Sequence, residues 1–259
     1  MQWKRIFKGK GIYLAIALQV FAYFYPHEAT HFWEFLLDYF GSADFLYFFL
    51  KPTQLGGLIT LLLPFVAVLP AALFIAEDLE TGYIRMILER SGKTKYAFSR
   101  MLEAMAGAVI ASMAGSLIYI GFIAILSPMD KNILTSWRDV LARSSYADLA
   151  AAWNGFPMVM DNMLRFAFAA ATWSLFAVAF SALSASSGLA LVLAFALHFS
   201  LGYIFESTTT LLGWSPARIQ IPSVYDQIPL AYITFQQFIY FAAGLAASLL
   251  GLRYRLNKM

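Results

Sequence analysis

One short segment of the chain matches the end of a nucleotide-binding motif. Residues Ser91-Gly92-Lys93-Thr94 contain the Gly-Lys-Thr with which a phosphate-binding loop ends. The complete motif needs a glycine five residues before Gly92, and that position is Ile87. The segment also lacks the buried strand that precedes such a loop. We therefore expect no site for ATP or Mg²⁺ in this chain, so that any ATP hydrolysis would need a separate subunit.

Other residues with catalytic or metal-binding chemistry are not grouped as a site requires. His27 and His31 are four residues apart, a spacing that could place two metal ligands on one helix face, but no third ligand follows at a fitting spacing. An intramembrane serine protease would need Ser187 and His198 on facing helices, whereas both fall in one predicted helix. The absence of cysteine excludes disulfides and thiol chemistry. These residues favour a protein that is not an enzyme and holds no cofactor of its own.

The composition indicates an all-α membrane protein. Hydrophobic residues make up 61% of the 259 residues and charged residues only 13%, with a mean hydropathy of +0.67. A helix of about 20 apolar residues crosses the hydrocarbon core, and helices are required because lipid cannot satisfy backbone polar groups. We predict a single transmembrane domain over residues 1–259. Its six predicted spans cover about 11–26, 55–76, 98–126, 163–184, 187–206 and 235–252.

The basic residues predict the orientation of these spans. Six spans place both termini on the same side of the membrane as the connections 77–97 and 185–186. That side carries twelve of the 18 Lys and Arg residues. Because short loops rich in Lys and Arg remain in the cytoplasm, we predict that both termini are cytoplasmic.

A charged segment from Glu77 to Arg100 separates the second and third predicted spans. Asp78 could cap a helix whose first turn includes Glu80, since acidic side chains suit the positive end of the helix dipole. Gly92 would end the helix. Apolar residues recur at helical spacing, at Leu79, Tyr83, Ile84, Ile87 and Leu88. The pattern predicts a short amphipathic helix on the inner membrane surface; an ordinary charged loop among the headgroups is the alternative.

This segment resembles the cytoplasmic loop between the second and third spans of ABC-2 type transporter permeases. The matching residues are Glu77, Glu80, Thr81, Gly82, Ile84, Ile87, Leu88, Ser91 and Arg100. Two features differ from the family pattern: the usual Gly-Thr order is reversed, and Gly92-Lys93 replaces a common proline. The resemblance extends over the whole chain in length, number of spans and position of the segment.

The resemblance implies the permease subunit of an ATP-driven ABC exporter in the bacterial plasma membrane. Two ATPase subunits would hold ATP and Mg²⁺, and a second permease copy or a paralogue would complete the transporter. Membrane lipid is the other expected partner, and no nucleic acid is expected. The substrate would be amphipathic, such as a peptide, a lipid-like molecule or a drug. The alternative is a membrane-embedded ligand-binding, immunity or scaffold protein that does not pump.

In such a permease the amphipathic segment would be the coupling helix, which fits a groove on the ATPase. The residues expected at this contact are Glu77, Asp78, Glu80, Thr81, Gly82, Tyr83, Ile84, Arg85, Ile87 and Leu88.

Polar residues inside the predicted spans form a second set of candidates. Gln19 and His198 lie in apolar surroundings, and Glu206 closes the fifth span. Because polar groups are costly in the membrane and often functional, we expect these three at a substrate path or a dimer contact. Hydrogen-bonded packing is the alternative for His198. Asp161 and Arg165 are one helical turn apart and should form a local ion pair.

Small residues recur at four-residue spacing in three predicted spans, where they would let helices approach closely. The rows are Ala104-Ala108-Ser112-Ser116, Gly107-Ala111-Gly115, Ala167-Ala171 and Ala243-Ala247-Gly251.

Overall fold

The computed structural model describes residues 3–25, 49, 58–126, 146–151, 155–208, 212–216, 218 and 228–259. Every regular element in this part of the chain is a helix, in agreement with the predicted all-α class. The helices are α1 (Trp3–Lys8), α2 (Lys10–Phe24), α5 (Leu58–Val68), α6 (Phe74–Glu80), α7 (Tyr83–Ser91), α8 (Lys93–Leu126), α10 (Ala147–Ala151), α11 (Phe156–Ser184), α12 (Ser187–Glu206), the 3-10 helix η2 (Leu212–Trp214) and α14 (Leu230–Asn257).

Within the described residues, four helices are long and apolar enough to cross a membrane: α8, α11, α12 and α14. They contain the predicted spans 98–126, 163–184, 187–206 and 235–252. Helices α2 and α5 have 15 and 11 residues, fewer than the roughly 20 that a full crossing needs. The chain therefore has the character of a membrane-embedded helical protein, while the count of six spans stays a prediction.

The predicted helix over 55–76 is interrupted. Helix α5 ends before a turn at Leu69–Leu73, and α6 follows the turn. Pro70 lies in this turn, where its missing N–H removes a helix hydrogen bond. Gly11 of α2 packs against the same turn, since a Cβ there would lie 2.1 Å from the carbonyl oxygen of Leu69. The prediction of one continuous helix is wrong, because hydropathy alone does not reveal a turn within an apolar run.

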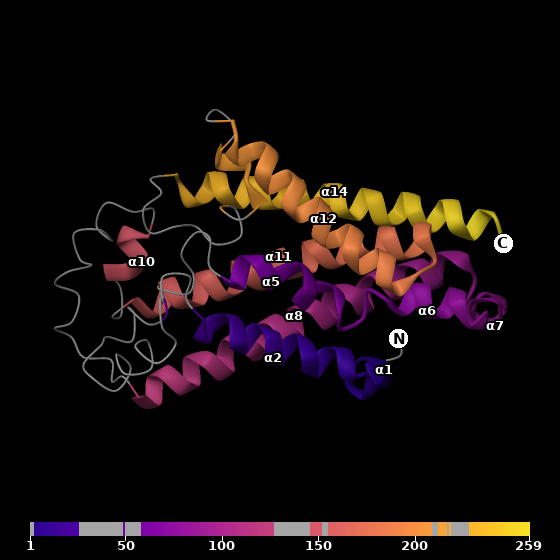
Figure 1. Ribbon diagram of the computed structural model, residues 1–259, viewed down its shortest axis with the longest axis horizontal. Helices are drawn as coiled ribbons and strands as arrows, with labels where there is room; N and C mark the ends of the chain where they lie inside the picture. Colours follow the sequence, from indigo (N-terminus) through magenta and orange to yellow (C-terminus); the bar gives the residue numbers. More distant parts are fainter. Residues whose placement is uncertain are drawn as a thin grey trace.

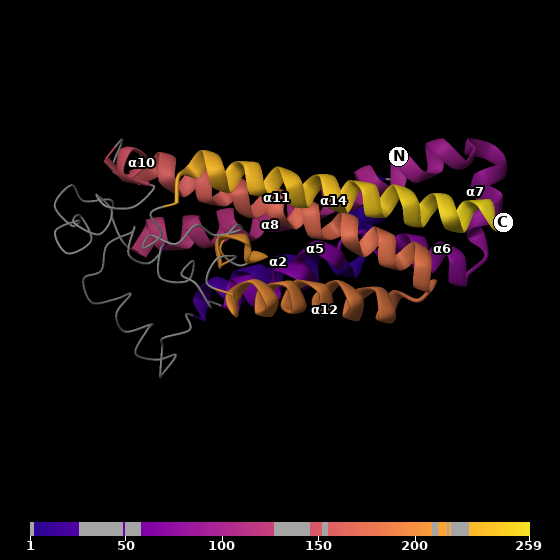
Figure 2. The ribbon, with the colours of Figure 1, turned by 90° about the horizontal axis from the view of Figure 1, so that it is seen from above.

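Helix α11 lies at the centre of the bundle. It packs against α14, α8, α12 and α5, and 83% of its most apolar stretch is buried, against 17% for α12. Figures 1 and 2 show α12 and α14 running along different sides of the bundle with α11 beside both. The outer surfaces of α12 and α14 are therefore the least covered among the described long helices.

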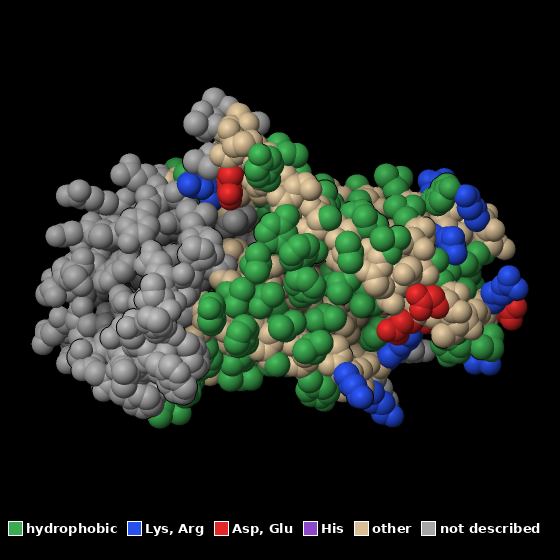
Figure 3. Space-filling view, in the orientation of Figure 1, with side chains coloured by type: hydrophobic (Ala, Val, Ile, Leu, Met, Phe, Trp, Pro, Cys, Tyr) green, Lys and Arg blue, Asp and Glu red, His purple; other side chains and the backbone are tan. Residues whose placement is uncertain are grey.

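Both ends of the chain lie toward the same end of the bundle as α6 and α7 (Figure 1). Lys93, the first residue of α8, donates a hydrogen bond of 2.5 Å from Nζ to the carbonyl oxygen of Leu256 in the last turn of α14. Hydrophobic side chains cover the middle of the molecule in Figure 3, and Lys and Arg side chains gather toward the end that carries α7. This arrangement agrees with the prediction that both termini lie on the same side as the connection 77–97. The cytoplasmic location of that side stays a prediction.

The small-residue rows of α8 are confirmed as close-packing positions. A Cβ on Gly115 would lie 2.4 Å from Cγ of Gln19 in α2, and one on Gly107 would lie 3.0 Å from Cβ of Pro70. On α14 the predicted row is confirmed at Gly251, where a Cβ would lie 3.2 Å from the carbonyl oxygen of Ala179. At its other two positions the buried residues are Gly244 and Ser248, one residue beyond Ala243, which is exposed, and Ala247, which is half-buried. Hydropathy did not show which side of α14 faces α11.

Candidate functional site

The amphipathic helix predicted after the second span is α7, Tyr83–Ser91. It lies between Gly82 at φ 70° and Gly92 at φ 75°, a backbone region that glycine adopts without steric cost. The predicted end of the helix at Ser91-Gly92 is confirmed. The predicted start is wrong, since Asp78 lies inside α6 and α7 has no side-chain cap.

The apolar face of α7 packs on its own chain. Ile84 is 2% exposed and belongs to a buried cluster that includes Tyr96 and Met101 of α8 and Leu252 of α14. Leu88 is partly buried against the same cluster. The expectation that Ile84 faces an ATPase groove is therefore corrected, because in this structure its side chain is buried within the chain's own core, where α7 packs against α6 and α8.

The opposite face of α7 points away from the bundle. Tyr83 and Met86 are 40% and 54% exposed, and Arg85, Glu89 and Arg90 are exposed around them. Met86 was absent from the residues predicted from the sequence. Its position two residues from Ile84, about 200° around a helix, could have identified it once the inward face was known.

Asp78 is the centre of a buried charge network. Its side chain is 1% exposed and accepts charged contacts from Arg5 of α1 at 2.6 Å and from Arg100 of α8 at 2.7 Å. The hydroxyl of Tyr96 donates to the same carboxylate at 2.9 Å. Arg100 also pairs with Glu103, which is 1% exposed. A buried carboxylate needs such partners, and here they join α1, α6 and α8.

Glu77 lies at the rim of this network. Its side chain is 46% exposed and pairs with Arg5 at 2.8 Å. The guanidinium of Arg5 lies 4.3 Å from the centre of the Phe74 ring, a cation–π contact. Glu77 and Phe74 thus hold α1 against α6.

Glu80 and Thr81 form the end of α6. A carboxylate oxygen of Glu80 accepts a hydrogen bond from the backbone N–H of Ser187 at 3.1 Å, in the first turn of α12. The positive end of that helix dipole favours the contact. The hydroxyl of Thr81 donates to the carbonyl oxygen of Glu77 at 2.7 Å. Glu80 therefore connects α6 to α12, and its predicted place in the first turn of α7 is corrected.

Gln19 lies in the contact between α2 and α8. Its side chain is fully buried, and Nε2 donates to the hydroxyl of Ser116 at 3.4 Å. The hydroxyl groups of Tyr23 and Ser116 are 3.0 Å apart. These contacts place Gln19 at a tight helix–helix interface within the chain.

His198 and Glu206 occupy two other places on α12. His198 is 4% exposed, hydrogen-bonds to the backbone of Thr60, and has its ring 4.7 Å from that of Trp173 at 77°. It therefore joins α12 to α5 and α11. Glu206, exposed at the end of α12, accepts a hydrogen bond of 2.7 Å from the hydroxyl of Ser215. Gln19, His198 and Glu206 have different partners, and their role in transport or dimerisation stays a prediction.

The predicted local ion pair of α11 is confirmed. Nε of Arg165 lies 2.6 Å from the carboxylate of Asp161, one turn earlier. Nη1 of Arg165 also donates to the hydroxyl of Thr234 at 2.9 Å and to the amide oxygen of Gln237 at 3.3 Å. The hydrogen bonds to α14 were not predicted, because sequence spacing carries no information about partners on another helix.

Within the described residues, no group of three or more His, Asp or Glu is arranged to hold a metal ion. His27 and His31 lie outside the described residues. Comparison of this chain with protein-family models, with curated proteins and with solved structures found no match in any of the three.

Proposed function

We propose that this chain is the permease subunit of an ATP-driven exporter and that α7 is its coupling helix. The observation that carries the proposal is the division of α7 into two faces. One face is packed on the chain's own core beside α8, where Ile84 is buried, and the other exposes Tyr83 and Met86 among charged side chains. A helix fixed on one side and open on the other can transmit the movement of a docked partner.

The contacts behind α7 support mechanical coupling. Force on α7 would reach α8 and α14 through the cluster around Ile84, and it would reach α1 through Asp78 and Arg5 at the end of α6. Movements of packed helices between discrete arrangements are a common form of switching. Closure of an ATPase dimer against α7 would therefore shift several membrane helices together.

The outward face defines the chemistry of the expected ATPase contact. Met86 and Tyr83 would enter an apolar part of the partner surface, and the surrounding charges of Arg85, Glu89 and Arg90 would set its orientation. ATP and Mg²⁺ would be bound by the partner. The transporter would lie in a bacterial plasma membrane and move an amphipathic substrate outward with a second permease copy or a paralogue.

The decisive experiment places a charge on each face of α7 separately. Met86→Asp should leave the permease folded, because Met86 is 54% exposed, but it should abolish ATPase retention and export. Ile84→Asp should instead unfold or destabilise the permease by several kcal/mol, since it buries a charge without a partner. Lys95→Gln, at an exposed position near the start of α8, is the control and should change neither property.

The measurements are ATPase copurification and substrate export for each variant, with thermal unfolding in detergent as the test of folding. If the Met86→Asp permease keeps its ATPase and exports normally, α7 is not the coupling element. If the wild-type chain neither retains an ATPase nor exports a substrate, the protein belongs to the non-pumping alternative, a ligand-binding, immunity or scaffold protein.

A further inference from the structure

A groove opens between α11 and α14 at the ends where both helices begin. Its volume is ≈ 350 Å³, within the usual range for small-molecule sites. The lining residues are Asp161, Leu164, Arg165, Phe168, Thr234, Gln237 and Phe238. The groove thus combines one anionic and one cationic side chain with apolar walls.

The charged end of the groove is held in place by the protein. The side chain of Arg165 is only 10% exposed, and its contacts with Asp161, Thr234 and Gln237 fix the guanidinium between the two helices. Those contacts use Nε and Nη1. The N–H groups of Nη2 are left, among the described residues, to donate to an acceptor in the groove. Asp161 is 27% exposed and provides negative charge beside it.

The walls of the groove are apolar and open to the surroundings. Leu164 of α11 and Phe238 of α14 are 54% and 58% exposed. The ring of Phe168 also lines the groove and contacts that of Phe238, with centres 5.4 Å apart. On a helix pair embedded in lipid, these side chains meet acyl chains.

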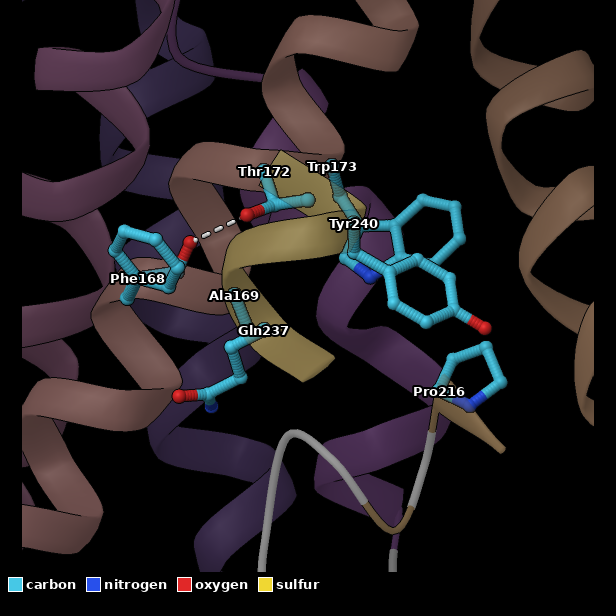
Figure 4. A pocket seen from close by; sticks show the side chains of 7 residues that line it. All are labelled: Phe168, Ala169, Thr172, Trp173, Pro216, Gln237 and Tyr240. Carbon is cyan, nitrogen blue, oxygen red and sulfur yellow. Dashed lines mark hydrogen bonds between the residues drawn. The ribbon is translucent and has the colours of Figure 1, made fainter. Parts of the chain in front are cut away.

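A smaller cavity adjoins the groove and shares Phe168 and Gln237 with it. Figure 4 shows the amide of Gln237 on one side of this cavity and the rings of Tyr240 and Trp173 near Pro216 on the other. The cavity volume of ≈ 20 Å³ fits about one water molecule. An acyl chain is too large to enter, so the apolar part of any ligand must follow the outer walls.

We propose that this groove binds a zwitterionic membrane phospholipid whose headgroup carries a primary ammonium. The phosphate accepts hydrogen bonds from Arg165, the ammonium pairs with Asp161, and the acyl chains lie on Leu164 and Phe238. Charge complementarity selects this class, since a purely anionic headgroup would bring no cation to Asp161 and would place further negative charge beside its carboxylate. The site does not depend on the protein being an exporter.

The test is native mass spectrometry of the detergent-purified protein with equal amounts of phosphatidylethanolamine and phosphatidylglycerol of identical chains. The wild-type protein should retain phosphatidylethanolamine preferentially. Arg165→Gln should lower that occupancy by about tenfold, the effect of losing a charged hydrogen-bond donor. Arg253→Gln, at an exposed position near the other end of α14, is the matched control. Asp161→Asn should reverse the preference toward phosphatidylglycerol.

A steric variant keeps the test valid even if Arg165→Gln fails to fold. Leu164→Trp fills the groove without altering either charge and should displace the lipid. Leu250→Trp makes the same change at a residue that is 68% exposed far along α14 and should not. Equal binding of both lipids by the wild-type protein would overturn the proposal, as would unchanged lipid occupancy in Leu164→Trp. It would also be overturned if Leu164→Trp only dissociated a dimer, since the groove would then be a subunit contact.

Discussion

The two ends of the bundle hold their charges in different ways. Near α7, Asp78 is buried and is paired with Arg5, 73 residues away, and with Arg100 on a third helix. At the start of α11, Asp161 and Arg165 are paired within one helical turn, and Asp161 remains 27% exposed. Every carboxylate contact of Asp78 described above comes from another helix, whereas the ion pair of Asp161 forms within α11 and only Arg165 reaches α14. A structural role suits the first cluster and a ligand-binding role suits the second.

The largest expected difference between the two ends is their accessibility to a reagent outside the cell. Single cysteines at Thr81 and Thr208, both exposed, probe the α7 end and the opposite end in a chain without native cysteine. On intact cells, a membrane-impermeant thiol reagent should label Thr208→Cys and should reach Thr81→Cys only after permeabilisation. Equal labelling of the two variants on intact cells would contradict the predicted cytoplasmic location of the α7 end.

Removal of the central carboxylate of the α7 end should have the largest effect on stability. Asp78→Asn leaves Arg5 and Arg100 without their shared partner, and breaking a buried ion pair costs about 3–5 kcal/mol. Thermal or denaturant unfolding in detergent measures this loss. Glu77→Gln is the matched control, because Glu77 is 46% exposed and such pairs contribute at most about 1 kcal/mol. Equal losses in the two variants would show that the network is no more than a surface feature.

These two clusters also mark how far the sequence could predict the structure. The Asp161–Arg165 pair follows from helical spacing, and it was predicted. The Asp78 network did not follow, because its partners are set by how α1, α6 and α8 pack. Glu103 gave one usable signal, since a carboxylate within a predicted span needs a buried partner.

The same limit applies to the candidate site and to the helix boundaries. Periodicity predicted the amphipathic character of α7, and Gly92 predicted its end, but neither could tell whether the apolar face meets a partner or the bundle. Burial of Ile84 in a cluster of the chain's own side chains decided that question. The interruption at Leu69–Leu73 was missed because an apolar run has the same hydropathy whether it is one helix or two.

Substitution of Gly11 and of Gly121 by alanine compares helix packing at the two ends of the bundle. We expect the loss of stability from Gly11→Ala to lie between those of Asp78→Asn and Asp161→Asn. Gly11→Ala places a Cβ 2.1 Å from the carbonyl oxygen of Leu69, and such overpacking costs about 1–3 kcal/mol. Gly121, toward the other end of α8, has nothing within 4 Å of its Cβ position. Gly121→Ala should therefore be neutral or stabilise the protein by up to about 1 kcal/mol. Unfolding temperatures that move in the same direction would contradict the close approach of α2 to the α5–α6 turn.

The smallest expected effect belongs to the outer ion pair. Asp161→Asn should lower the free energy of unfolding by about 1 kcal/mol or less, since the pair is local and partly exposed to solvent. Arg165 also keeps its hydrogen bonds to Thr234 and Gln237, which limit the loss. The measurement is unfolding in detergent beside Asp78→Asn under the same conditions. A loss for Asp161→Asn as large as that for Asp78→Asn would mean that both carboxylates hold helices together. The charges in the groove would then serve to hold the helices and would not be available to a ligand.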